Sequence, residues 1–159
     1  MSSPTPRPRP AHFHAYRWQG ERRVFDQEAD RRPHPFTTPL DRRDAEPSPG
    51  FLANPCTPLR IADWLLRPAS AITRTCRDAE EAAAWFTAEL TRAAPAFASE
   101  RDRQLAPVLA AGAAERLARG GDVHGGWYLR GTGYLTLDVI ACSPHPADPT
   151  LPCPLRARP

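Results

Sequence analysis

The sequence predicts an α+β fold in which an antiparallel sheet of about four strands is covered on one face by about three helices. Residues 134–142 alternate apolar and polar side chains, a pattern typical of a strand with one buried face. Residues 78–93 and 99–117 instead place apolar side chains at helical spacing. Residues 12–18 alternate again, so we expect strands near both ends of the chain and helices between them.

The four strands are expected to form two hairpins. At the N-terminal end, residues 19–21 can turn after the strand at 12–18, and residues 22–26 can return as its partner. At the C-terminal end, residues 124–130 and 134–142 flank a Gly-Thr-Gly turn. The second of these strands should direct Leu, Val and Ala to one face and Tyr, Thr, Asp, Ile and Cys to the other.

The helices are expected between the hairpins. Thr57 followed by Pro58 is a cap and first-turn pair, and it predicts a short buried helix that ends at Pro68. Asp78 lies three residues before Glu81, an arrangement analogous to the capping box, and predicts a helix to about residue 93.

A third helix is expected after Ser99, ending at Gly120-Gly121. Pro107 lies inside it and would cost about 3 kcal/mol in a straight helix, so we expect a kink or a fresh helix starting there. The large apolar side chains on the inner faces of all these elements should form the core. These are Trp64, Trp85, Phe86, Leu105, Leu109, Leu117, Leu135, Leu137 and Val139.

Proline divides the chain of 159 residues. Of 20 prolines, 11 lie in residues 1–58 and six in residues 144–159. We therefore expect a disordered Pro/Arg arm at 1–10, a single α+β domain at 11–143 and a Pro-rich tail at 144–159. The domain should contain a long Pro/Arg-rich loop at about 27–56.

All 21 basic residues are arginine, a usage expected of a GC-rich bacterial genome, which weakens any argument that arginine was selected for phosphate contacts. The net charge of +3 is uneven, because residues 1–43 carry nine arginines and five acidic residues. No run approaches the roughly 18 apolar residues of a membrane span, and the chain starts without the apolar region of a signal peptide. We expect a cytoplasmic protein without membrane contact, whose cysteines are reduced thiols or metal ligands.

Residues 121–125 read GDVHG, which resembles the signature with which metal-dependent phosphoesterases present their first two ligands. A two-metal site needs further Asp, Asn and His ligands, and residues 126–159 contain neither a GNH nor a second GD motif. The string also follows the end of an expected helix, where Gly-Gly-Asp is ordinary turn chemistry. It is therefore interpreted as a helix end followed by a strand start.

Cys142, His145 and Cys153 have C-x2-H-x7-C spacing, and these residue types bind zinc. The spacing fits no standard zinc knuckle, so the primary expectation is that no cofactor is bound, with Cys142 beside the sheet and the tail thiol and imidazole in solvent. Zinc is the alternative. Its fourth ligand would be His12, His14 or Cys56.

No catalytic constellation is recognised, so the sequence favours a non-catalytic binding or regulatory protein that acts through another protein, with a homodimer as one form. One alternative is a nucleic-acid-binding module that uses the basic N-terminal part. The other is a small enzyme with a pocket lined by His14, His124, Asp138 and Cys142. The residues expected to bind a partner are Arg17, Trp18, Arg22, Arg23, Arg31 and Arg32.

Overall fold

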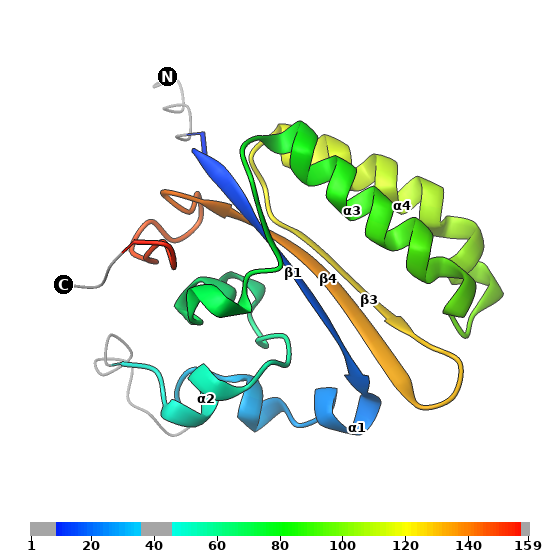
Figure 1. Ribbon diagram of the computed structural model, residues 1–159, viewed down its shortest axis with the longest axis horizontal. Coiled ribbons are helices and arrows are strands. Elements are labelled where there is room, and N and C mark those ends of the chain that lie inside the picture. The colour runs from blue at the N-terminus through cyan, green and yellow to red at the C-terminus, as the bar shows by residue number, and fades with distance from the viewer. Residues whose placement is uncertain (1–8, 36–45, 157–159) are drawn as a thin grey trace, which may run out of the picture.

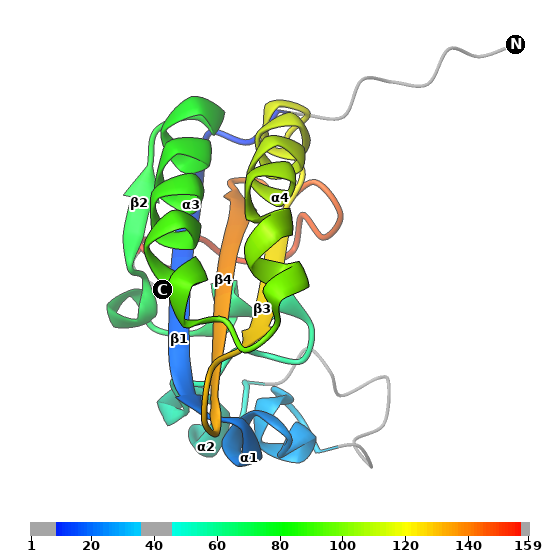
Figure 2. The ribbon, with the colours of Figure 1, turned by 90° about the vertical axis from the view of Figure 1, so that its right-hand side faces the viewer.

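A computed structural model describes residues 9–35 and 46–156, so most of the expected N-terminal arm lies outside the described residues. A four-stranded antiparallel sheet lies at the centre, with strand order β2-β1-β4-β3 (Figures 1 and 2). This confirms the predicted α+β class. The strands are β1 (His12–Glu21), β2 (Arg74–Cys76), β3 (Val123–Tyr128) and β4 (Gly133–Cys142).

Two long helices, α3 (Ala79–Ala93) and α4 (Glu100–Ala118), lie side by side on one face of the sheet (Figure 2). As the sequence predicts, the Asp78 and Ser99 side chains accept hydrogen bonds from backbone amides of the first turns. No helix within the described ranges combines the length and apolar character needed to cross a membrane. Within residues 9–35 and 46–156, the shorter helices are α1 (Arg22–Phe25), α2 (Pro49–Ala53) and four 3₁₀ helices, Glu28–Arg31, Ile61–Leu66, Ala69–Ala71 and Ala94–Ala96.

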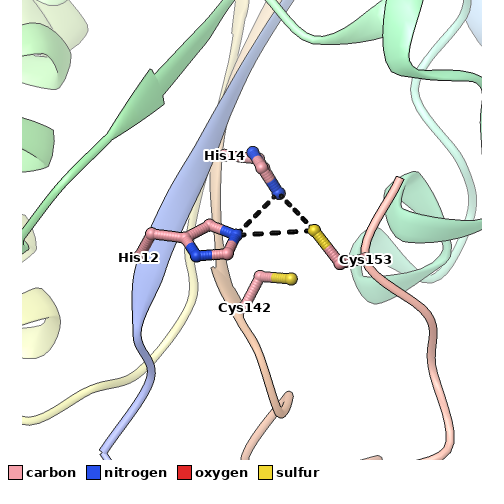
Figure 3. A group of neighbouring side chains, drawn as sticks. All are labelled: His12, His14, Cys142 and Cys153. Carbon is pink, nitrogen blue, oxygen red and sulfur yellow. Dashed lines mark hydrogen bonds between the residues drawn. The ribbon is translucent and has the colours of Figure 1, made fainter. Parts of the chain in front are cut away.

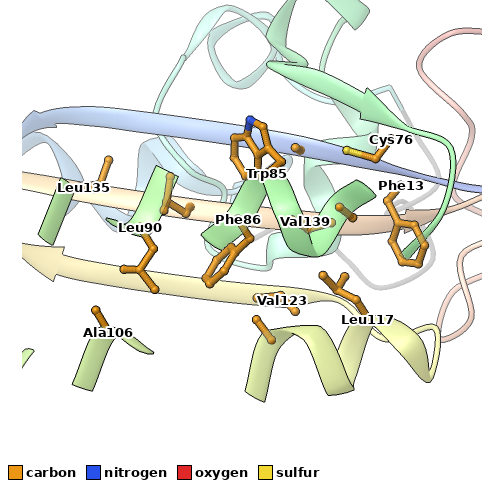
Figure 4. Close-up of a cluster of buried hydrophobic side chains, with 14 of the residues drawn as sticks. Phe13, Cys76, Trp85, Phe86, Leu90, Ala106, Leu117, Val123, Leu135 and Val139 are labelled. Atoms are coloured by element: carbon orange, nitrogen blue, oxygen red, sulfur yellow. The ribbon is translucent and has the colours of Figure 1, made fainter. Parts of the chain in front are cut away.

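The main core lies between the sheet and these two helices (Figure 4). Leu135, Leu137 and Val139 are fully buried on the β4 face that the sequence alternation predicts. Trp85 and Phe86 from α3 pack against them. Each such side chain contributes about 1.5–3 kcal/mol by leaving water, so this layer is the main source of stability.

The opposite face of the sheet is also covered, although the sequence analysis expected it to be open. In Figure 1 the irregular segment around α2 and the C-terminal tail lie on the side of the sheet away from α3 and α4. Trp64 and Leu65 of the 3₁₀ helix Ile61–Leu66 and Leu151 of the tail form a second apolar cluster against Tyr16 and Ile140. The polar residues of β4 on this face are therefore buried.

The N-terminal strand differs from the expected hairpin. Residues 22–25 form the helical turn α1 instead of a returning strand, and the fourth strand is β2. β1 instead pairs along its whole length with β4 on one edge, and with β2 at Phe13, His14 and Ala15 on the other. Phe25 then folds back onto Tyr134, with a ring separation of 4.3 Å, and closes that end of the sheet.

Helix α4 also differs from the prediction, because it is one continuous helix of 19 residues with Pro107 inside it. Its buried residues are Ala106, Ala113 and Leu117, so small side chains face the interior. The predicted core residues Leu105 and Leu109 are 36% and 42% exposed. Leucine spacing alone gave the wrong face, since the helix turns its small residues toward its neighbours to pack closely.

The two leucines on α4 allow a matched test of this packing. Leu117→Ala should lower the free energy of unfolding by about 2–5 kcal/mol, because the side chain is fully buried. Leu109→Ala should lower it by about 1 kcal/mol or less at a concentration where the chain is monomeric, since that leucine is 42% exposed. Urea denaturation of both variants measures the difference, and equal losses would contradict this orientation of α4.

Candidate metal centre

Four potential metal ligands meet where β1, β4 and the tail come together (Figure 3). They are His12, His14, Cys142 and Cys153, and one donor atom from each lies within 4.8 Å of the others. His12 is half-buried, and the other three are buried. We refer to these four residues as the His2Cys2 cluster.

The separations within the cluster match those of a tetrahedral zinc site. The Nε2 atoms of His12 and His14 are 3.1 Å apart, and the Cys153 sulfur is 3.6 Å from each. Zinc bonds of about 2.0–2.1 Å to nitrogen and about 2.3 Å to sulfur place tetrahedral ligands about 3.4 Å apart for two nitrogens and about 3.5 Å for nitrogen and sulfur. These three donor atoms therefore lie at the distances that a single shared cation requires.

The sheet positions three of the four ligands. His12 and His14 are two residues apart on β1, so their side chains lie on the same face. The β1–β4 register pairs His12 directly with Cys142. The fourth ligand, Cys153, reaches the cluster because the tail folds back over this face (Figure 3).

The Thr75 hydroxyl is a hydrogen-bond partner of the His14 imidazole in the cluster. The Nδ1 atom of His14 lies 2.9 Å from the Thr75 hydroxyl on β2. A histidine that binds metal through Nε2 commonly donates its other ring N–H to a fixed oxygen, which sets the orientation and tautomer of the ring. When Nδ1–H of His14 donates to the Thr75 hydroxyl, Nε2 is left free for a metal.

The electrostatics of the cluster are suited to a divalent cation. Burial, together with the neighbouring His12, lowers the pKa of His14 to about 4, so the ring is neutral at neutral pH. Burial and the neighbouring Cys153 raise the pKa of Cys142 to about 12, so two thiolates are disfavoured here without a counter-charge. Two thiolates and two neutral imidazoles around Zn²⁺ carry no net charge, which is the arrangement a buried site can accept.

His145, a zinc candidate in the sequence analysis, lies outside the His2Cys2 cluster. Its Nε2 atom is 2.7 Å from the carboxylate of Asp122, and its Nδ1 atom accepts hydrogen bonds from the backbone amides of Ala147 and Asp148. Both ring nitrogens are therefore occupied. The contact between His145 and Asp122 attaches the start of the tail to the start of β3. Asp122 belongs to the GDVHG string, which is interpreted as a helix end followed by a strand start.

The residues of the enzyme alternative fall into two pairs on one sheet face. His14 and Cys142 belong to the His2Cys2 cluster, whereas His124 Nδ1 lies 2.5 Å from the Asp138 carboxylate. Ile140 lies between Asp138 and Cys142 on the same side of β4 and is fully buried. An apolar side chain thus separates the two pairs.

The residues expected to bind a partner do not form one surface, because they differ in burial and in the sheet face to which they point. Arg17 and Trp18 point to opposite faces of β1, and Trp18 and Arg31 are buried. Arg17 and Arg32 form ion pairs with acidic neighbours, and each lines a surface hollow, of about 200 Å³ and about 330 Å³ respectively. Three members of the set are exposed, Arg17 on β1 and Arg22 and Arg23 in α1.

Sequence reasoning named His12 and His14 only as options for a fourth ligand, and it missed Thr75. The H-x-H spacing on a predicted strand is the signal that both imidazoles share a face. Cys56, the third option, is buried elsewhere and is not part of the cluster. Nothing in the local sequence of Thr75 indicates its role, because β2 reaches the cluster only through pairing with β1.

Comparisons of the chain with models of protein families, with curated proteins and with solved structures found no match. The functional argument therefore rests on the geometry of the chain itself.

The Thr75 hydroxyl gives a specific test of the metal geometry. Thr75→Val should weaken zinc binding by about 10–100-fold, because it removes the hydrogen bond that orients His14. Thr73→Val, two residues away and bonded to the Arg17 amide, is the matched control and should bind zinc normally. Competition titration against a zinc chelator measures both affinities, and unchanged binding by Thr75→Val would contradict this assignment.

Proposed function

We propose that the protein binds one zinc ion through the His2Cys2 cluster and that this metal has a structural role. The observation that carries the proposal is the meeting of donor atoms from β1 and the tail at the spacing of a tetrahedral site, with the Cys142 donor atom of β4 within 4.8 Å of them. Tetrahedral sites with two sulfur and two nitrogen ligands are characteristic of zinc. The ion joins the tail to the two central strands.

The number of ligands favours a structural centre over a catalytic one. Catalytic zinc sites keep one position for water or substrate, whereas structural sites use four protein ligands. With all four cluster residues bound, no position is left for a reactant. The proposal is thus consistent with a non-catalytic binding protein, the function that the sequence favours.

Metal analysis of the purified full chain tests the proposal. We expect one zinc per chain, and replacement by Co²⁺ should give the absorption bands of a tetrahedral thiolate site. Cys153→Ala should abolish both, because it removes a ligand. Removal of zinc should lower the free energy of unfolding, by about 2.7 kcal/mol relative to protein held at zinc 100-fold above its dissociation constant.

The matched control for this experiment is Cys76→Ala. Cys76 is buried like Cys153 but lies outside the cluster, so this variant should keep one zinc per chain. A wild-type chain that contains no zinc and folds identically with and without added metal would overturn the proposal.

An exposed apolar stripe on α4 supports a protein partner, and a second copy of the chain is the simplest one. Leu105, Val108 and Leu109 are 36%, 66% and 42% exposed and lie on consecutive turns of the helix. Adjacent exposed apolar groups can mark a surface for association with another protein. We therefore propose self-association through α4.

Val108 is the most exposed residue of this stripe and is the position to change. The wild-type chain should dimerise with increasing concentration in sedimentation equilibrium, and Val108→Asp should weaken dimerisation because it places a charge in the apolar interface. Ala118→Asp, on an exposed position of α4 ten residues beyond Val108, controls for the added charge alone. A wild-type chain that is monomeric at every concentration would contradict self-association through α4.

A further inference from the structure

The two cysteines of the His2Cys2 cluster are also close enough to react with each other. The sulfur atoms of Cys142 and Cys153 lie within 4.8 Å of one another, and both residues are free thiols. Figure 3 shows their side chains next to each other. A disulfide needs a distance of about 2.05 Å between the sulfur atoms, so they must approach by no more than about 2.8 Å.

The tail allows this approach, whereas the sheet holds the other sulfur in place. Cys142 is the last residue of β4 and is in register with His12 of β1. Cys153 belongs to the tail, whose described part, residues 144–156, contains no helix or strand. A change of the side-chain rotamer also moves a cysteine sulfur about its Cβ. The pair can therefore close from the side of Cys153 without a change in the strand register.

Exposure to solvent distinguishes the two sulfurs from the other cysteines of the chain. Cys153 is 6% exposed and Cys142 is 1% exposed, while Cys56 and Cys76 are completely buried. Cysteines that respond to peroxides are commonly the accessible ones and lie beside a second cysteine that resolves the first product. Cys76 lies in the core on the helix-covered face, so the sheet separates it from this pair.

We propose that Cys142 and Cys153 are an oxidation site, at which hydrogen peroxide converts the two ligand thiols into a reversible disulfide and so displaces the zinc. The displacement rests on the zinc site proposed above, whereas the disulfide does not require a metal. Cys153 is the sulfur that reacts first, because it is the more exposed of the two. Cys142 is its resolving partner.

The reaction takes two steps. The Cys153 sulfur attacks one oxygen of the peroxide, the O–O bond breaks, and the second oxygen leaves as water, so that Cys153 becomes a sulfenic acid. The Cys142 sulfur then attacks the Cys153 sulfur, the S–O bond breaks, and the second water leaves. Two thiols and one hydrogen peroxide thus give one disulfide and two waters. When the sulfurs start as zinc-bound thiolates, the two protons of these waters come from solvent and Zn²⁺ is released.

Oxidation would change which parts of the chain are joined. Zinc bound to the cluster connects His12 and His14 of β1 with both cysteines, whereas the disulfide connects Cys142 and Cys153 alone. A cross-link that encloses a short segment removes less entropy from the unfolded chain than one that encloses a long segment. The oxidised chain should therefore unfold at a lower urea concentration than the zinc-bound chain.

Treatment of the zinc-loaded full chain with a small excess of hydrogen peroxide tests the proposal. Intact mass spectrometry should show the loss of two hydrogen atoms, about 2 Da, and a chromogenic chelator should detect one zinc released per disulfide. Cleavage before Asp148, which lies between the two cysteines, should leave two peptides joined by a disulfide. Dithiothreitol should reverse the oxidation and restore zinc binding.

Two variants separate the roles of the cysteines. Cys142→Ser lacks the resolving sulfur, so Cys153 should stop at the sulfenic acid and react with a 1,3-dicarbonyl probe. Cys76→Ala is the matched control and should form the same disulfide as the wild type. Cysteines that stay reduced in peroxide, or a wild-type disulfide that involves Cys56 or Cys76, would overturn the proposal.

The same experiment distinguishes this proposal from the zinc site. A chain that forms the Cys142–Cys153 disulfide but never contains zinc supports the oxidation site and contradicts the zinc site. A chain that contains one zinc and keeps it in peroxide, with both cysteines reduced, contradicts the oxidation site alone.

Discussion

The pairing of β1 with β4 is the constraint on which the rest of the structure depends. Ten consecutive residues of β1 are in register with β4, and this register assigns every side chain of both strands to one of two faces. A slip of one residue would move the two histidines of β1 into the helix-covered core and bring its apolar residues to the other side. The core, the His2Cys2 cluster and the Asp138 network therefore follow from a single alignment.

The second face is buried although its β4 residues are mostly polar, and it is stable because those polar groups have partners. Asp138 accepts from Trp64 and faces His124, and Thr136 is bonded to Thr57. An unpaired carboxylate in this position would cost several kcal/mol, so the covering segment must supply donors as well as apolar contacts. Tyr16 stacked on Trp64, with ring centroids 4.4 Å apart, supplies the apolar part. The layer therefore holds polar groups with fixed orientations, which is what a binding site needs.

Local sequence patterns predicted those parts of the fold where pattern and packing agree. The alternation of β4 and the Asp78 cap of α3 identified both elements, because each signal depends on residues close together in the chain. The face of α4 was wrong, since leucines and alanines occur on several sides of that helix and only contact with α3 and the sheet selects one. The ligand set was only partly predictable for the same reason. Cys142 and Cys153 were named as candidate ligands. The choice of His12 and His14 over His145 depends on strand pairing between residues about 130 positions apart. It also depends on the contact of His145 Nε2 with the Asp122 carboxylate, which leaves that nitrogen unavailable to a metal.

The position of the His2Cys2 cluster in the chain explains why a metal would be valuable there. Its four residues lie at positions 12–14 and 142–153, so one ion bound there would close a loop that contains nearly the whole domain. In the chain-entropy account of cross-links, closing a loop of about 100 residues stabilises the folded state by about 4.7 kcal/mol, and metal clips across long loops act in the same way. The tail is otherwise attached through Leu151 in the second apolar cluster and through the His145–Asp122 contact, because its prolines prevent it from adding a strand to the sheet. A metal cross-link between the two ends would thus stabilise the β1–β4 register directly, at the end of the ladder where His12 meets Cys142.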